Sequence, residues 1–142
     1  MRRGEFPSAG ETTPAELLAA YQTRLAAVVD AVGLERAAAR TGVAGPRLEA
    51  LLEGEAGDLP LESAAAILAL EEGAPDAATI EAEARDVLLM GMTTAVVDVD
   101  RLASDIDDEL EPKEIQQKVE GRLSMTLAEY ARLHHELAAQ GF

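Results

Sequence analysis

Residues 13–33, TPAELLAAYQTRLAAVVDAVG, decide the fold class of this chain. This stretch begins with a pattern typical of a helix N-terminus: Thr13, then Pro14, and Glu16 three residues after the threonine. The side chains of the threonine and the glutamate cap the first turn reciprocally. Gly33 is suited to end the helix. Between them, apolar residues recur at alternating spacings of three and four, and these are Leu18, Tyr21, Leu25, Val28 and Val32. The stretch predicts one long helix with a narrow apolar seam.

Similar start and stop signals divide the rest of the chain into helices. After the first helix we expect helices over residues 34–40, 46–54 and 61–70. Beyond Pro75 we expect helices over residues 77–97, 100–106, 112–121 and 126–139, with an acidic loop at 107–111. The sequence therefore predicts an all-α, compact helical protein of about eight helices.

The predicted helices form two units with the same order: long helix, short helix, turn, helix ending in Glu-Gly, loop and helix. Matching residues lie 65 to 67 positions apart, as in Arg36 with Arg101, Gly54 with Gly121 and Leu61 with Leu127. A duplication with loop insertions explains these offsets, and chance similarity between alanine-rich helices is the alternative. We place a flexible tail at 1–12, the first unit at 13–72, a linker at 73–76 and the second unit at 77–140, packed with the first as one domain.

The composition indicates a folded chain with a strongly acidic surface. It has 27 acidic and 12 basic residues, a net charge of −15 and 48% hydrophobic residues, and Lys113 and Lys118 are its only lysines. Repulsion at this charge density is relieved when the screening length falls to about 3 Å in molar salt. We therefore expect adaptation to a high-salt cytoplasm, with an ordinary acidic protein as the alternative.

The termini and the apolar runs indicate a cytoplasmic chain without membrane association. No apolar run follows Arg2 and Arg3, so the start lacks the hydrophobic region of a signal peptide. The run at residues 87–92 is too short to span a membrane. Because there is no cysteine, disulfides and thiolate chemistry are excluded.

No motif in the sequence predicts an enzyme, a cofactor, a metal or a small-molecule substrate. His134 and His135 are adjacent and point about 100° apart on a helix, whereas two metal ligands on one face need a spacing of three or four. The aspartates at 98–108 lack the glycine and glutamate positions of a calcium loop. No phosphate-binding glycine loop or nucleophile elbow occurs.

Within each unit, the short helix, turn and following helix resemble the helix-turn-helix of phage-type repressors. Gly42 and Val43 stand where that family has its turn glycine and the core residue after it, whereas residues 105–111 replace the tight turn in the second unit. In the family, the later helix enters the major groove. The resemblance points to the first turns of that helix, at Ala44, Gly45, Arg47, Ala50, Lys113, Glu114, Gln116 and Gln117. Together with the nearby cations, the candidate DNA-binding residues are Arg36, Arg40, Arg47, Lys113, Gln116, Gln117, Lys118 and Arg122.

The chain from about Thr13 to Leu137 also resembles a haloarchaeal family of unknown function. The residues that carry the resemblance are those at 88–95, 114–118 and 125–130. It is consistent with adaptation to salt and implies no activity, cofactor or catalytic residue.

Two functions remain open from the sequence, both non-enzymatic. The first choice is a helix-turn-helix-like binding protein, with DNA-binding transcriptional regulation as one role open to it, and the alternative is a protein-interaction or dimerisation module that does not bind DNA. The scarcity of lysine and arginine argues for the alternative, because DNA affinity depends on phosphate contacts. An acidic surface is, however, expected of every protein in a high-salt cytoplasm, so the overall charge does not decide between the two functions. The seams of the two long helices either pack on each other, which we favour, or one of them contacts a second chain in a homodimer.

Overall fold

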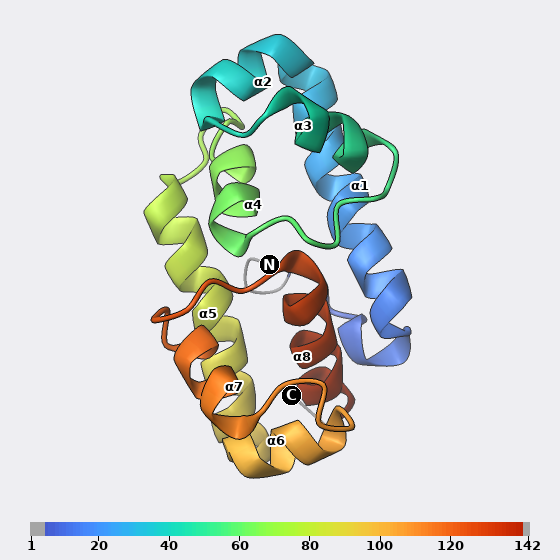
Figure 1. Cartoon of the computed structure of the whole chain (residues 1–142), viewed down its shortest axis with the longest axis vertical. Helices are drawn as coiled ribbons and strands as arrows, with labels where there is room; N and C mark the ends of the chain where they lie inside the picture. Colours follow the sequence, from blue (N-terminus) through green and yellow to red (C-terminus); the bar gives the residue numbers. More distant parts are fainter. Residues whose placement is uncertain (1–4, 141–142) are drawn as a thin grey trace.

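The computed structural model describes residues 5–140, which form eight α-helices and one short 3-10 helix (Figure 1). Their bounds are η1 Ala9–Glu11, α1 Pro14–Val32, α2 Leu34–Thr41, α3 Gly45–Leu52, α4 Leu61–Leu68, α5 Ala77–Ala95, α6 Val99–Asp105, α7 Pro112–Val119 and α8 Leu127–Ala139. The predictions of an all-α compact fold and of about eight helices are confirmed.

Side-chain caps fix the starts of the helices where the sequence predicts them. The Thr13 hydroxyl accepts a hydrogen bond from the Glu16 N–H at 3.1 Å, and the Glu16 carboxylate accepts one from the Thr13 N–H at 3.2 Å. Thr126 and Glu129 form the same reciprocal pair at the start of α8, at 3.1 and 2.9 Å. These bonds satisfy backbone N–H groups that have no partner inside the helix.

The two long helices lie on opposite sides of the molecule, and α4 and α8 lie between them (Figure 1). Each long helix packs on the last helix of the other unit, α1 on α8 and α5 on α4. The expected lengthwise packing of α1 on α5 is therefore wrong. The seam residues Tyr21, Leu25 and Val28 are buried, but they face α8 and the helices of their own unit.

A short backbone bridge joins the two units at matching positions. Pro60 and Thr126 form an isolated antiparallel bridge. The Leu61 N–H donates to the Met125 carbonyl at 2.7 Å, and the Leu127 N–H donates to the Leu59 carbonyl at 2.8 Å. Leu61 and Leu127 are the residues that the sequence aligns at an offset of 66. The same segment of each unit thus pairs with its counterpart about an approximate two-fold axis, which supports the duplication.

One hydrophobic core contains side chains from both units. We expect a flexible tail over residues 1–12, but residues 5–12 pack against this core. Ala9 is buried, η1 packs on α8, and the Phe6 ring meets the Tyr21 ring edge-on with 4.8 Å between centroids. The aromatic contact accounts for this ordered packing of residues 5–12. Residues 1–4 lie outside the described residues.

No single helix within residues 5–140 is long and apolar enough to cross a membrane. Helices α1 and α2 have sufficient length and hydrophobicity only as a pair, and the chain bends by 104° between them.

His134 lies in the core between the two units rather than at the surface. It is 6% exposed, and its Nδ1 shares a hydrogen bond with the hydroxyl of the buried Tyr21. Burial lowers the pKa of His134 to about 3, because the charged imidazolium would lose its hydration in the core. The folded protein therefore holds this histidine in its neutral form at neutral pH.

We expect His134 to make stability depend on pH. The unfolded chain binds this proton near pH 6.5, so the stabilisation is complete above about pH 6.5 and is lost as pH falls towards 3, by up to about 1.4 kcal/mol per pH unit. Urea unfolding of the parent and of His134→Gln at molar potassium chloride measures this. As pH falls, the unfolding free energy of the parent should decrease more steeply than that of His134→Gln. A difference that is constant between pH 7 and pH 4 would contradict the prediction.

Candidate functional site

The first unit contains a tight turn between α2 and α3. Gly42 has φ 77° and ψ 3°, a left-handed conformation that a residue without a Cβ adopts at little cost. The Thr41 hydroxyl donates to the Ala37 carbonyl at 2.7 Å and accepts from the Val43 N–H at 3.1 Å. These bonds place Val43 in the core and start α3 at Gly45.

The candidate cations of the first unit, Arg36, Arg40 and Arg47, are exposed, but the outer face of α3 is acidic. Arg36 and Arg40 lie on the exposed side of α2, and within residues 5–140 neither forms an ion pair. Arg47 is 3.6 Å from the Asp58 carboxylate (Nη2 to Oδ2). Glu49 and Glu53 are the exposed charged residues that accompany Arg47 on and just after α3. A recognition helix would therefore present carboxylates to DNA at this surface.

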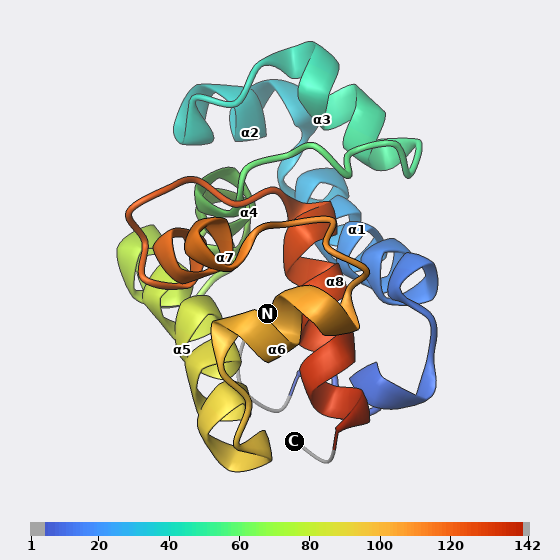
Figure 2. The ribbon, with the colours of Figure 1, turned by 60° about the horizontal axis from the view of Figure 1, so that its bottom comes forward.

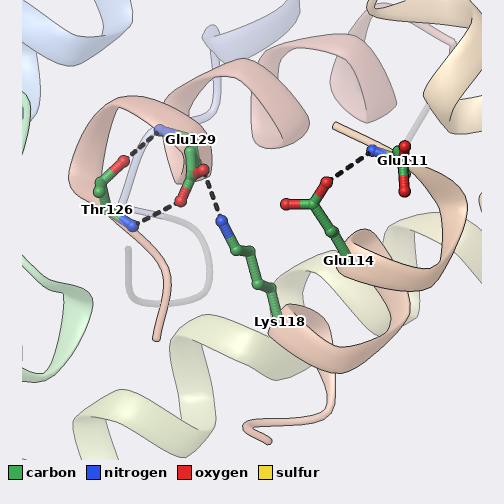
Figure 3. A network of polar contacts seen from close by, with 5 residues as sticks. All are labelled: Glu111, Glu114, Lys118, Thr126 and Glu129. Atoms are coloured by element: carbon green, nitrogen blue, oxygen red, sulfur yellow. Dashed lines mark hydrogen bonds and ion pairs between the residues drawn. The ribbon is translucent and has the colours of Figure 1, made fainter. Parts of the chain in front are cut away.

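Lys118 of the second unit is held inside the protein by an ion pair (Figure 3). Its Nζ lies 2.6 Å from Oε2 of Glu129, and its side chain is 12% exposed. The other oxygen of Glu129 accepts the Thr126 N–H at the start of α8. The Lys118 carbonyl in turn accepts from Nε of Arg85 on α5, at 3.0 Å. Lys118 thus joins α7 to α8 and α5, and its ammonium group is not directed to solvent.

Carboxylates occupy the N-terminus of α7. The Glu114 side chain accepts the Glu111 N–H at 3.4 Å, and both glutamates lie at the first turn (Figure 3). A helix N-terminus attracts anions through its free N–H groups and its dipole. Here two carboxylates of the chain lie at that position, so any phosphate contact of the candidate Lys113 would have to be made beside them.

Three further candidates lie on α7 or just after it. Gln116 donates to Glu120 at 2.9 Å, and Arg122 forms an ion pair with the same carboxylate. The hydrogen bonds from Gln116 and Arg122 lower the pKa of Glu120. Gln117 is half-buried.

Carboxylates of the chain thus contact four of the eight candidate residues, Arg47, Gln116, Lys118 and Arg122. Figure 1 places α2 and α3 at one end of the long axis and α6 and α7 towards the other. The structure therefore does not bring the two groups of candidates together on one surface. Figure 2, from a second direction, also separates α3 from α6. Within residues 5–140, no three histidine, aspartate or glutamate side chains are arranged to hold a metal ion.

An apolar surface that the sequence analysis misses lies at the end of α5. It consists of Leu89, Met92, Thr93 and Val96, which we call the α5 patch. Val96 is 84% exposed, and it caps α5 with φ 55° and ψ 53°. The signal in the sequence is the run from Val87 to Val97, which contains no ionisable residue in a chain with 27% charged residues.

The described residues form a compact all-α protein of eight α-helices. Residues 17–140 match a family of unknown function (DUF5791), and the chain belongs to that family. No curated protein and no solved structure matches the chain.

Proposed function

We propose that this protein is a non-enzymatic binding module of a high-salt cytoplasm, and that its partner is a protein rather than DNA. The observation that carries the proposal is the state of the candidate cations. Lys118, one of the two candidate lysines, is paired with Glu129 and is 12% exposed on its side chain. If Lys118 turned towards DNA, the part-buried Glu129 carboxylate would lose its ion pair, which would cost stability.

The overall charge supports the same choice. Binding to DNA depends on cations that neutralise phosphates and release their counterions. This chain has a net charge of −15, and carboxylates already contact Arg47 and Arg122. Protein interfaces rely instead on apolar and aromatic contacts at their centres, which an acidic protein is able to present.

The turn of the first unit favours a second candidate function, DNA binding through α2 and α3 alone. The left-handed Gly42 gives the tight connection that helix-turn-helix proteins use, and Arg36 and Arg40 lie on the exposed side of α2. The acidic residues Glu49 and Glu53 on the outer side of α3 oppose this candidate.

We expect the folded protein to show no sequence-selective binding to DNA. The test is a fluorescence anisotropy titration with pooled genomic fragments, at a potassium chloride concentration where circular dichroism reports full helicity. Lys113→Ala, Gln116→Ala and Gln117→Ala should bind DNA like the parent. Selective binding that is lost in Arg36→Ala with Arg40→Ala, but not in Lys113→Ala, would replace the proposal with the second candidate. Selective binding weakened by about 1–3 kcal/mol in Gln116→Ala would restore α7 as a DNA-reading helix.

A further inference from the structure

The segment before α1, residues 5–12, turns back beside the end of α8, and we call it the strap (Figure 2). Its η1 turn packs on α8, and its Phe6 ring packs on Tyr21 of α1. Ala9 of the strap is buried. The strap therefore covers the surface where α1 meets α8, one helix from each unit.

Gly10 brings the backbone of the strap directly against the backbone of α8. A Cβ atom at this position would lie 2.6 Å from the carbonyl carbon of Ala138 and 2.7 Å from the nitrogen of Ala139, so no side chain fits without a shift. Gly10 does not have a positive φ, so the close approach and not the turn requires a glycine. We call the covered surface the strap seat, and its residues are Leu17 and Tyr21 of α1 and Ala138 of α8.

The backbone hydrogen bonds of the strap close within the strap. The Ala9 N–H donates to the Phe6 carbonyl at 3.2 Å, and the Glu11 N–H donates to the Ser8 carbonyl at 2.9 Å. Among the described residues, no backbone hydrogen bond joins residues 5–12 to the rest of the chain. The strap is therefore able to leave its seat as one turn without breaking backbone pairing elsewhere.

The charged contact of the strap also permits its release. The Glu5 carboxylate lies 3.6 Å from the Arg24 guanidinium (Oε2 to Nε), and both side chains are partly exposed. Such a pair contributes little, and molar salt screens it. Arg24 also donates two hydrogen bonds to Glu71, at 2.9 and 2.5 Å, so it keeps a carboxylate partner when the strap leaves. Phe6 and Ala9 are therefore the main anchors of the strap.

The strap does not fill the space beneath it. A cavity of about 240 Å³ remains between the strap and α1, and Phe6 and Pro7 line it on one side and Leu17 and Ala20 on the other. Closely packed protein interiors leave few spaces larger than a water molecule. A different segment with a larger side chain in this place would therefore make more contacts with α1 than the strap makes.

The strap seat has the composition of a protein-binding surface. Release of the strap uncovers Leu17 and the ring of Tyr21, which are 3% and 0% exposed beneath it. Apolar and aromatic side chains of this kind form the centres of protein interfaces. The strap seat also lies within residues 17–140, which match the family, whereas the strap lies outside that match.

We propose that the strap is an autoinhibitory segment, and that a segment of a partner protein replaces it on the strap seat. The proposal rests on the proposed function, because it places the protein partner on one surface. The strap itself shows the chemistry that this surface accepts. Its aromatic ring lies on Tyr21, and two small residues, three and four positions later, pack at α8. The partner segment therefore has an aromatic residue followed at that spacing by alanine or glycine.

A synthetic peptide with the sequence of residues 5–13 is the probe for the strap seat. Fluorescence anisotropy at molar potassium chloride measures its binding to the full chain. In the parent, the attached strap competes at a high effective concentration, so the peptide should bind about tenfold or more weakly than to a chain whose strap is released. The same peptide with Phe6→Ala lacks the aromatic anchor and should bind to neither protein.

Gly10→Ala releases the strap, because the added Cβ meets the backbone of α8. Ser8→Ala is the matched control: it introduces the same residue at an exposed position of the strap, so this variant should bind the peptide as weakly as the parent. Phe6→Ala is a second releasing variant, which removes the anchor without a clash. Circular dichroism of each variant reports whether it is folded.

Tighter peptide binding by Gly10→Ala and Phe6→Ala than by the parent and Ser8→Ala is the expected result. Folded releasing variants that bind the peptide no better than the parent would overturn the proposal. Loss of the fold in both releasing variants would also overturn it, because the strap would then be an integral part of the core. The anisotropy titration with DNA tests the proposed function independently: selective DNA binding would refute that function, whereas failed peptide binding refutes the strap alone.

Discussion

Replacing Tyr21 with aspartate is expected to lower the free energy of unfolding by about 4 kcal/mol or more, enough to unfold most of the protein in dilute buffer. Tyr21 is fully buried in α1, 5.7 Å from the Tyr130 ring, and its hydroxyl pairs with His134. Aspartate would lose the aromatic contacts, leave a cavity and place a carboxylate in the core. It would also remove the hydroxyl that shares a hydrogen bond with His134.

Two control variants isolate the cause of this effect. Thr23→Asp makes the same change of charge on the exposed side of α1, and it should change stability by less than about 0.5 kcal/mol. Tyr21→Phe keeps the ring and removes only the hydroxyl, so it should cost about 1–3 kcal/mol for the lost buried hydrogen bond to His134. Urea unfolding followed by circular dichroism in molar potassium chloride gives the three values. If Tyr21→Asp unfolds at the same urea concentration as Thr23→Asp, Tyr21 is not in the core.

The helix boundaries follow from the sequence because caps act over one turn. Thr13, Pro14 and Glu16 lie within four consecutive residues, and the structure has the expected bonds among them. The inward side of α7 is equally local. Ile115 and Val119 are buried, as their spacing of four predicts, and Gln116 on the opposite side is exposed.

The partner of each helix face does not follow from the sequence in this way. The seam of α1 identifies what is buried, but every helix with an apolar face is a suitable neighbour, and the chain places α8 there instead of α5. The constant offsets between the units predict that the two units pair with each other, because duplicated units commonly pack about a two-fold axis. The sequence alone does not indicate whether the units pair side by side or exchange their last helices.

The candidate site shows the same division between local and long-range information. From the sequence, Lys118 is expected to be a free cation on an exposed helix. In the structure its Nζ lies 2.6 Å from Oε2 of Glu129 on another helix. Val96 is one valine in an apolar run until its left-handed backbone and its exposure of 84% are known. In both cases the decisive property depends on the tertiary structure, which no short pattern encodes.

Raising potassium chloride from dilute to molar is expected to increase the melting temperature by about 10 °C or more, in one cooperative transition. The reason is the net charge of −15 on a chain with 12 basic residues. Between α6 and α7, the consecutive residues Asp107 and Asp108 both have positive φ, 57° and 59°, and both are exposed. Arg132 approaches Asp107 only to 3.7 Å. As the screening length falls from about 10 Å to about 3 Å, the repulsion among such carboxylates disappears while the core is unchanged.

Neutralising carboxylates should reduce the salt that the fold requires. Asp107→Asn with Asp108→Asn removes two negative charges and keeps a residue type that tolerates the left-handed backbone. We expect this variant to melt at a higher temperature than the parent in dilute buffer and to approach the parent in molar salt, because screening makes the two charges irrelevant there. Melting followed by circular dichroism over a potassium chloride series measures both proteins. Sucrose, which stabilises compact states without screening charge, is the control for a general solvent effect. Curves that are flat in salt, or a variant that differs from the parent equally at every concentration, would show that charge repulsion does not limit this fold.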